Sequence, residues 1–255
     1  MDSERNELLM SSVLDIGKLM LISGAEIYRI EDTITRLFRA YGGTDPQVNA
    51  VPSNIVASVR LEGKEYTLTR RITHSDTDLE RLDRLNALSR RLCSQTPEPE
   101  EIARLTREAC SKRGYGPVQN ALIYALTAGA FTLFFGGAWN DALLSAVIAF
   151  LLFWLRQMII ALGGNKVFVA LLGSAFAALM STLANAAKLV NDADKVVIGV
   201  VMVLIPGVEL LNGIRDLISG DIQAGIMHIS EALFLAVIIA VGAAGVFTLA
   251  ARMGM

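Results

Sequence analysis

The sequence predicts an α-helical membrane protein in which about five transmembrane helices follow a small cytoplasmic α+β domain. Two observations predict this class. Hydrophobic residues make up 53% of the 255 positions, more than an ordinary soluble domain carries. The charges are also unevenly distributed, because residues 1–115 hold 17 of the 23 Lys and Arg residues and 18 of the 25 Asp and Glu residues. We therefore predict a cytoplasmic α+β domain over residues 1–115 and a transmembrane domain over residues 116–255.

The overall charge and the cysteines exclude some classes of protein. A net charge of -2 gives no basic surface for nucleic acid. Cys93 and Cys110 lack metal-ligand spacing and are predicted to be free thiols in a reducing compartment, so we expect no metal and no cofactor. Asp15 and Lys18 interrupt the first apolar stretch, which therefore lacks the uninterrupted core of a signal peptide. The amino terminus is expected to stay in the cytoplasm.

Helical periodicity in the charged half predicts two amphipathic helices, over residues 9–20 and 27–38. Between them, Ser23-Gly24-Ala25-Glu26 has the S-x-x-E form of a capping box, which predicts that the second helix starts there. The charged face formed by Glu26, Arg29, Glu31 and Asp32 is interpreted as a solvated helix surface with local ion pairs.

Alternating residues predict a β-hairpin over residues 55–72, with a turn at Glu62-Gly63. Residues 48–51, just before Pro52, are expected to add an edge strand, since proline cannot donate a hydrogen bond to a central ladder. Two further helices are predicted over residues 82–92 and from Pro99 to residue 109. His74 is interpreted as a loop residue, and no catalytic constellation is present in this half.

Five apolar runs in the second half predict the transmembrane helices, since about 20 helical residues cross the hydrocarbon core. The runs cover residues 118–135, 142–162, 167–187, 196 to about 211, and 222–251. Lys112 and Arg113 precede the first run and set the amino end inside by the positive-inside rule. An odd number of spans then places the carboxyl end outside. Stripes of small residues such as Gly173, Ala177 and Ser181 predict close helix packing in a bundle or an oligomer.

Pro206 and Gly207 predict a helix break inside the fourth run, because proline lacks an N–H and clashes with the preceding turn. The run reaches membrane length only by including Glu209, and Asn212 follows soon after it. A carboxylate inside a membrane is by default a pathway residue. The alternative is a simple kink with Glu209 at the membrane interface.

Further polar residues accompany the last apolar runs. His228 and Glu231 stand one helical turn apart, and His228 lies about 10 Å past Asp221. Such a pair can take and release protons near neutral pH once burial and mutual attraction shift their pKa values. Arg156 either snorkels to the membrane surface or, with Arg215, binds a carboxylate.

Several short motifs, in this order and spacing, resemble the threonine/serine exporter family over almost the whole chain. They are Ser23-Gly24-Ala25-Glu26, Tyr28-Arg29-Ile30-Glu31, Arg70-Arg71, Gly136-Gly137-Ala138-Trp139, Arg156-Gln157, Pro206-Gly207, Asn212, Asp216, Gly220-Asp221 and Gly225. The resemblance implies an inner-membrane exporter of small hydrophilic metabolites with a cytoplasmic amino-terminal domain. Because only one membrane unit is present, the chain is similar to the split form, which implies a smaller partner subunit and either threonine/serine-type or dicarboxylate substrates such as succinate.

We therefore expect a secondary exporter subunit, and we expect it to be proton-coupled. The alternatives are a membrane-anchored sensor, regulatory or assembly protein, and an intramembrane enzyme. The residues expected on the substrate and proton pathway are Glu209, Asn212, Arg215, Asp216, His228, Glu231 and Arg156. A homo-oligomer, a partner membrane subunit, or both are expected to complete the polar path.

Overall fold

The computed structural model describes residues 2–74, 76–111 and 114–253, so Lys112 and Arg113 lie outside the described residues. The chain forms two compact units. Unit 1 comprises Met1–Gly114 and Gly207–Ser230, and unit 2 comprises Tyr115–Pro206 and Glu231–Met255. The division predicted at residue 115 is a single boundary, whereas unit 1 also takes in a second segment from late in the sequence.

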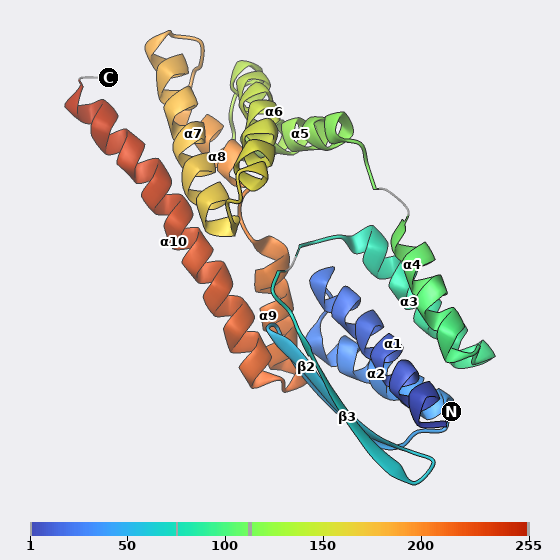
Figure 1. Ribbon diagram of the computed structural model, residues 1–255. Coiled ribbons are helices and arrows are strands. Elements are labelled where there is room, and N and C mark those ends of the chain that lie inside the picture. The colour runs from blue at the N-terminus through green and yellow to red at the C-terminus, as the bar shows by residue number, and fades with distance from the viewer. Residues whose placement is uncertain (1, 75, 112–113, 254–255) are drawn as a thin grey trace. The chain divides into compact units, whose positions relative to one another are not determined.

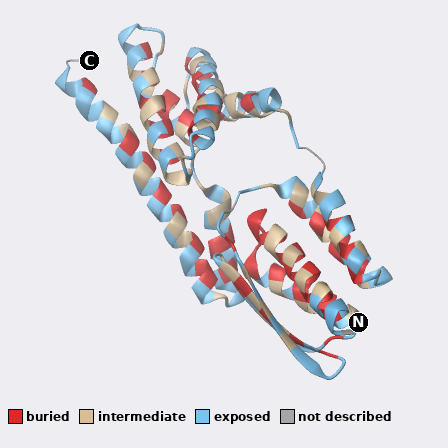
Figure 2. Ribbon diagram, viewed as in Figure 1, coloured by how far each residue is buried: buried red, intermediate tan, exposed pale blue. Residues whose placement is uncertain are grey.

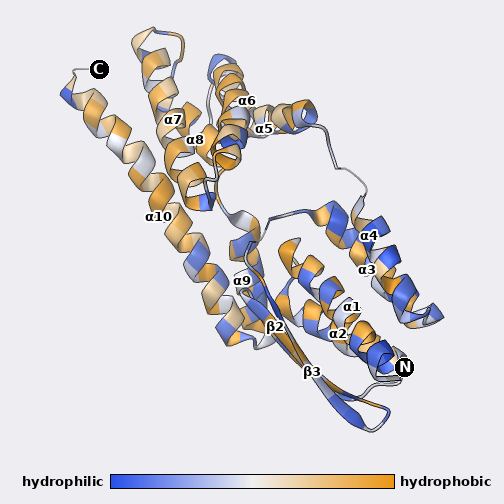
Figure 3. Ribbon diagram, in the orientation of Figure 1, coloured by the Kyte–Doolittle hydropathy of each residue, from blue (hydrophilic) through white to orange (hydrophobic). Residues whose placement is uncertain are grey.

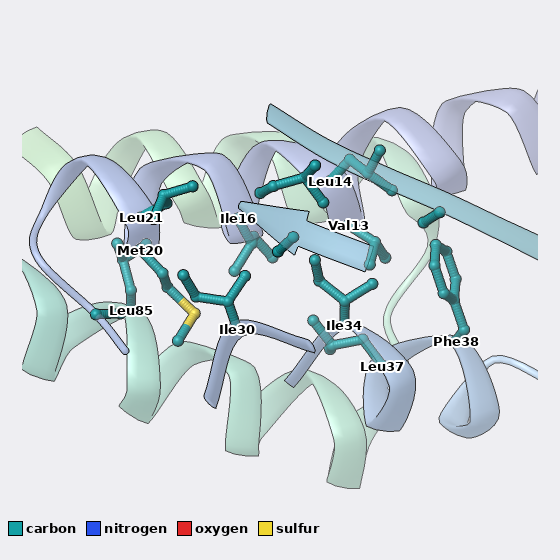
Figure 4. Close-up of a cluster of buried hydrophobic side chains, with 14 of the residues drawn as sticks. Val13, Leu14, Ile16, Met20, Leu21, Ile30, Ile34, Leu37, Phe38 and Leu85 are labelled. Carbon is teal, nitrogen blue, oxygen red and sulfur yellow. The ribbon is translucent and has the colours of Figure 1, made fainter. Parts of the chain in front are cut away.

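Unit 1 is built mainly from helices that pack their apolar faces together (Figure 1). Its helices are α1 (Asp2–Ile22), α2 (Ile27–Ala40), α3 (Leu79–Gln95), α4 (Pro99–Ser111), α9 (Gly207–Ser219) and the start of α10 (Ile222–Arg252). The predicted periodicity of the first four helices is confirmed. Figure 4 shows how α1, α2 and α3 bring Leu14, Ile34 and Leu85 into one cluster, in which all three are fully buried.

A three-stranded antiparallel sheet completes unit 1, with the strand order β1 (Thr44–Val51), β2 (Asn54–Leu61) and β3 (Lys64–Arg71). The predicted hairpin and edge strand are confirmed. Glu62 and Gly63 both have positive φ angles, 51° and 79°, as the tight two-residue turn between β2 and β3 requires. Alternate residues of β2, including Ile55 and Ala57, are buried in the same core as the helices.

The second helix begins at Ile27, directly after the Ser23–Glu26 segment where its start was predicted, and the predicted capping box is not formed. Glu26 is the N-cap residue and its side chain makes no capping hydrogen bond. The Ser23 hydroxyl instead donates to the Leu19 carbonyl oxygen, at 2.6 Å. The capping box fails because the Ser23 N–H donates to the Leu19 and Met20 carbonyl oxygens at the end of α1, and arginines engage the Glu26 carboxylate.

Unit 2 contains α5 (Pro117–Phe134), α6 (Trp139–Ala161), α7 (Lys166–Ala186), α8 (Ala193–Val201) and the remainder of α10. Small residues lie at the helix contacts, and Ala128, Ala149 and Ala177 are fully buried. Large apolar side chains such as Leu126 and Val147 are exposed instead. Figure 2 shows this alternation of buried and exposed positions along α6 and α7. Exposed apolar side chains over a core of small residues are typical of helices in lipid.

Three helices, and not about five, are long and apolar enough to cross a membrane among the described residues. They are α6, α7 and α10, which Figure 3 shows as mainly hydrophobic. The fourth predicted run is divided between α8 and α9, which have 9 and 13 residues, whereas a span needs about 20. The first run becomes α5, whose first turn is polar because it contains Gln119 and Asn120. The helical membrane class stands, with a smaller number of spans.

Candidate functional site

The site is built around the α1–α2 junction, defined here as residues 23–26. Gly24 has a φ of +91°, a conformation that glycine adopts without strain, and the chain reverses there. The Gly24 carbonyl accepts a hydrogen bond from Asn212 Nδ2 at 2.9 Å. The carbonyl of Ser23 accepts from the backbone N–H of Asp78 at 3.2 Å. Segments far apart in sequence therefore hold the junction from different sides.

Asp216 lies on α9 and is completely buried. Its Oδ1 accepts from the backbone N–H of Ile27, the first residue of α2, at 3.1 Å. The first N–H groups of a helix have no partner inside the helix, and the helix dipole favours a negative charge at that end. Asp216 thus caps α2 from a position 189 residues later in the chain.

His228 contacts the other oxygen of this carboxylate. Its Nδ1 lies 2.9 Å from Asp216 Oδ2, and the His228 side chain is 11% exposed. The two atoms are within hydrogen-bonding distance, and either ring nitrogen of an imidazole can carry a proton. Asp216 and His228 therefore form a buried pair in which both members can bind a proton.

Two glycines bring α9 and the start of α10 close enough to form this pair. A Cβ atom added to Gly213 would lie 2.7 Å from Ile229 Cγ1 and 3.1 Å from His228 Cβ. One added to Gly225 would lie 2.8 Å from the Gly213 carbonyl oxygen. Real Cβ atoms essentially never lie within 3.0 Å of another atom, so a larger residue at either position forces neighbouring atoms of the two helices to shift.

A second polar group lies at the same end of α2. Glu26 Oε1 pairs with Arg215 Nη1 at 2.5 Å, and Glu26 Oε2 pairs with Arg29 Nε at 3.3 Å. The Glu26 side chain is 5% exposed, whereas those of Arg215 and Arg29 are 51% and 42% exposed. One buried carboxylate therefore holds two arginines that reach solvent.

Two further carboxylates of unit 1 interact with the Asp216 charge. Burial raises the pKa of Glu31, the negative charges of Asp221 and Asp216 raise it further, and the hydrogen bond from the Ala50 N–H opposes this. Burial also raises the pKa of Asp221, and the charge of Asp216 adds to the effect. Protons are accordingly held more tightly on Glu31 and Asp221 than on free carboxylates.

The structure brings together Asn212, Arg215, Asp216 and His228 of the residues predicted for the pathway. Glu231 pairs with Lys166 in unit 2, at 3.5 Å, and both side chains are partly exposed. Arg156 lies on α6 and makes no hydrogen bond or ion pair with any described residue. Glu209 is half-buried in the first turn of α9, directly after the break at Pro206 and Gly207.

Sequence reasoning missed the roles of Glu26 and Arg29, which were interpreted as parts of a solvated surface. Their motif was recognised, but nothing near Glu26 in sequence shows that α9 contributes Arg215. It also missed Asp141, which is 1% exposed in unit 2 and accepts from the backbone N–H groups of Ala138 and Asn191, at 3.0 and 2.7 Å. Asp141 opens an apolar run, and it carried no motif of its own.

A family model described as "Putative threonine/serine exporter" (ThrE) matches residues 11–250. The chain belongs to this threonine/serine exporter family. The match confirms the predicted resemblance to this family. The whole of the site from residue 23 to residue 228 lies within the matched range.

A curated relative from Mycobacterium tuberculosis (strain ATCC 25618 / H37Rv), named "Probable threonine/serine exporter", is 24% identical over 246 residues. The alignment covers 94% of this chain and 46% of the relative, so the chain spans about half the length of the protein it matches. No solved structure matches the chain.

Proposed function

We propose that this member of the exporter family is a subunit of a secondary exporter that carries a small carboxylate-bearing metabolite out of the cytoplasm, coupled to protons. The substrate is a threonine/serine-type amino acid or a dicarboxylate such as succinate. The name of the M. tuberculosis relative supports the first of these. The protein lies in the cell inner (plasma) membrane with its amino terminus in the cytoplasm.

The observation that carries the proposal is the buried pair of Asp216 and His228. A proton added to this pair raises its net charge by one. Asp216 also caps α2, so the same proton changes the strength of the bond to the Ile27 N–H. Protonation is thereby linked to the position of the α1–α2 junction, as coupling requires.

The subunit is proposed to work as a homo-oligomer, with a partner membrane subunit, or both. Three helices of the described residues are suited to crossing a membrane, and three helices are few to enclose a polar path.

The test is transport by the purified full chain in lipid vesicles. Counterflow of labelled threonine, serine and succinate is measured with and without an inward pH gradient, and a protonophore serves as the control for coupling. We expect exchange of at least one solute and acceleration by the gradient that the protonophore removes. Absence of exchange for all three solutes, compared with protein-free vesicles, would contradict an exporter that works as a homo-oligomer alone, and exchange insensitive to the gradient would contradict proton coupling.

A further inference from the structure

We propose that Arg29 and Arg215 together form a binding site for a carboxylate group, and that the buried Glu26 between them positions the two guanidinium groups. The inference rests on the proposed function only in taking the carboxylate to be that of the exported solute. In this proposal Arg29 of α2 and Arg215 of α9 bind the carboxylate of the solute, and Arg156 does not take part.

The geometry of Glu26 carries the first step. Its two carboxylate oxygens engage different arginines, so a single side chain fixes guanidinium groups that come from two helices. A buried carboxylate is costly unless it is paired, so these two contacts restrain the arginines strongly. Arg29 and Arg215 are thus held near each other before any ligand arrives.

The second step of the inference depends on the N–H groups of Arg29 and Arg215 that do not contact Glu26. A guanidinium has about five N–H donors in a planar fork. Arg215 donates through Nη1 and Arg29 is paired through Nε, and no other described residue accepts from either group. Both side chains are about half exposed, so their remaining donors reach solvent. The three charges sum to one positive charge, which attracts an anion, and a planar carboxylate matches the guanidinium fork.

Comparison with other ion pairs of unit 1 separates this cluster from ordinary surface charge. Arg36 on the same helix pairs with Asp32, and these side chains are 70% and 52% exposed. Arg104 pairs with Glu101 at 60% and 43% exposure. Exposed pairs of this kind contribute little and hold neither partner in place. Glu26 differs because it is buried and shared between two arginines.

The carboxylate could belong to an amino acid or to a dicarboxylate, and the test distinguishes these sources. The thermal unfolding midpoint of the full chain in detergent is measured against L-threonine, succinate and L-threonine amide, which lacks the carboxylate. A ligand that binds only the folded state raises the midpoint. We expect threonine or succinate to raise it and the amide to have no effect.

Variants of each arginine locate the site. Arg29→Gln and Arg215→Gln should each weaken the binding of the active probe about tenfold or more, because each removes charge-assisted hydrogen bonds. Each variant leaves the other arginine to pair with Glu26, which protects folding. Arg36→Gln on the same helix is the matched control and should bind as the wild type does.

A positioning role for Glu26 predicts a graded response. Glu26→Asp keeps the charge and should bind the probe more tightly than Glu26→Gln. If Glu26 had only a structural role, the substitutions would change the unfolding midpoint measured without probe and leave the affinity for the probe unchanged. Three results would overturn the inference. The amide would bind as tightly as threonine, or neither arginine variant would change the affinity for the probe, or no probe would raise the unfolding midpoint of the wild type. A binding response without transport in vesicles would contradict transport by this chain without a partner subunit and leave the carboxylate site standing. Transport unchanged in both arginine variants would contradict the site alone.

Discussion

Asp216 in unit 1 and Asp141 in unit 2 are both buried aspartates, with 0% and 1% exposure, but their partners differ. Asp141 accepts only from backbone N–H groups, one at the start of α6 and others in the loop before α8. Asp216 accepts from one backbone N–H and shares its second oxygen with an imidazole. A carboxylate satisfied entirely by backbone can only hold structure, whereas one paired with a titratable group can also exchange protons.

The same contrast extends to the surroundings of the two aspartates. Unit 2 joins its helices through small side chains and local hydroxyl contacts, such as the bond from Thr132 Oγ1 to Ser145 Oγ at 2.8 Å. Unit 1 joins the α1–α2 junction to α9 through charged and amide side chains that include half-exposed arginines. Ligand chemistry is therefore expected in unit 1, and unit 2 is expected to supply packing.

The largest expected effect comes from making the same substitution at both aspartates. Asp216→Asn should lower export about a hundredfold, because a positioned proton carrier is lost while the amide oxygen can still accept from Ile27. Asp141→Asn should leave export per folded chain near the wild-type value and lower the free energy of unfolding by about 1–3 kcal/mol. Vesicle transport normalised to folded protein, together with thermal unfolding, measures both. The reverse pattern would show that the two aspartates have been assigned the wrong roles.

A smaller effect is expected from adding a methyl group at a tight helix contact in each unit. Gly199→Ala in unit 2 places a Cβ against Thr132 and 2.8 Å from the Ala128 carbonyl oxygen, and overpacking of this kind costs about 1–3 kcal/mol. Gly213→Ala in unit 1 should cost a similar amount. It should also slow export about tenfold or more, since it displaces His228 from Asp216 and small misplacements of reacting groups are costly.

Stability and transport are measured for both alanine variants. Gly245→Ala, where an added Cβ meets no atom within 4 Å, is the matched control and should change neither quantity. If the two variants were equally stable and Gly199→Ala slowed export as strongly as Gly213→Ala, unit 2 would also take part directly in transport.

The smallest effect concerns the acidic neighbours of Asp216. Asp221 has a raised pKa, so its contribution to stability is complete below its ordinary pKa of 3.8 and is lost as the pH rises through the higher folded value. Asp221→Asn should therefore match the wild type near pH 3.8 and be more stable at pH 7, by about 0.5 kcal/mol or less because the group is mostly solvated. Unfolding midpoints between these two pH values test this, with Asp45→Asn as the exposed control. Equal pH profiles for wild type and Asp221→Asn would contradict it.

The parts of the fold that depend on neighbours in sequence were predictable. The Glu62-Gly63 hairpin and the periodicity of α1 and α2 are local patterns, and each appears in the structure. The helix break at Pro206 was also recognised from proline chemistry. Its consequence was not, because hydropathy runs on through the break from α8 into α9 and so suggested one span where two short helices lie.

The partners of the site residues were mostly not predictable, because the decisive contacts are long-range. A serine and a glutamate three residues apart indicate a capping box, but Arg215, 189 residues away, takes the glutamate. His228 has Glu231 one turn away in sequence, yet its partner is Asp216 across the α9–α10 turn. The sequence identified four residues of the site and could not show which of them meet.

The return of residues 207–230 to unit 1 has a consequence for the order in which the protein folds. During synthesis α1 to α4 and the sheet emerge first, whereas α9 arrives only after α5 to α8 have been made. Until then the Ile27 N–H, the Gly24 carbonyl and the Glu26 carboxylate lack the partners that satisfy them in the finished structure. The amino-terminal domain must therefore persist with an open polar end while the intervening helices enter the membrane, and it closes only when the chain has passed His228.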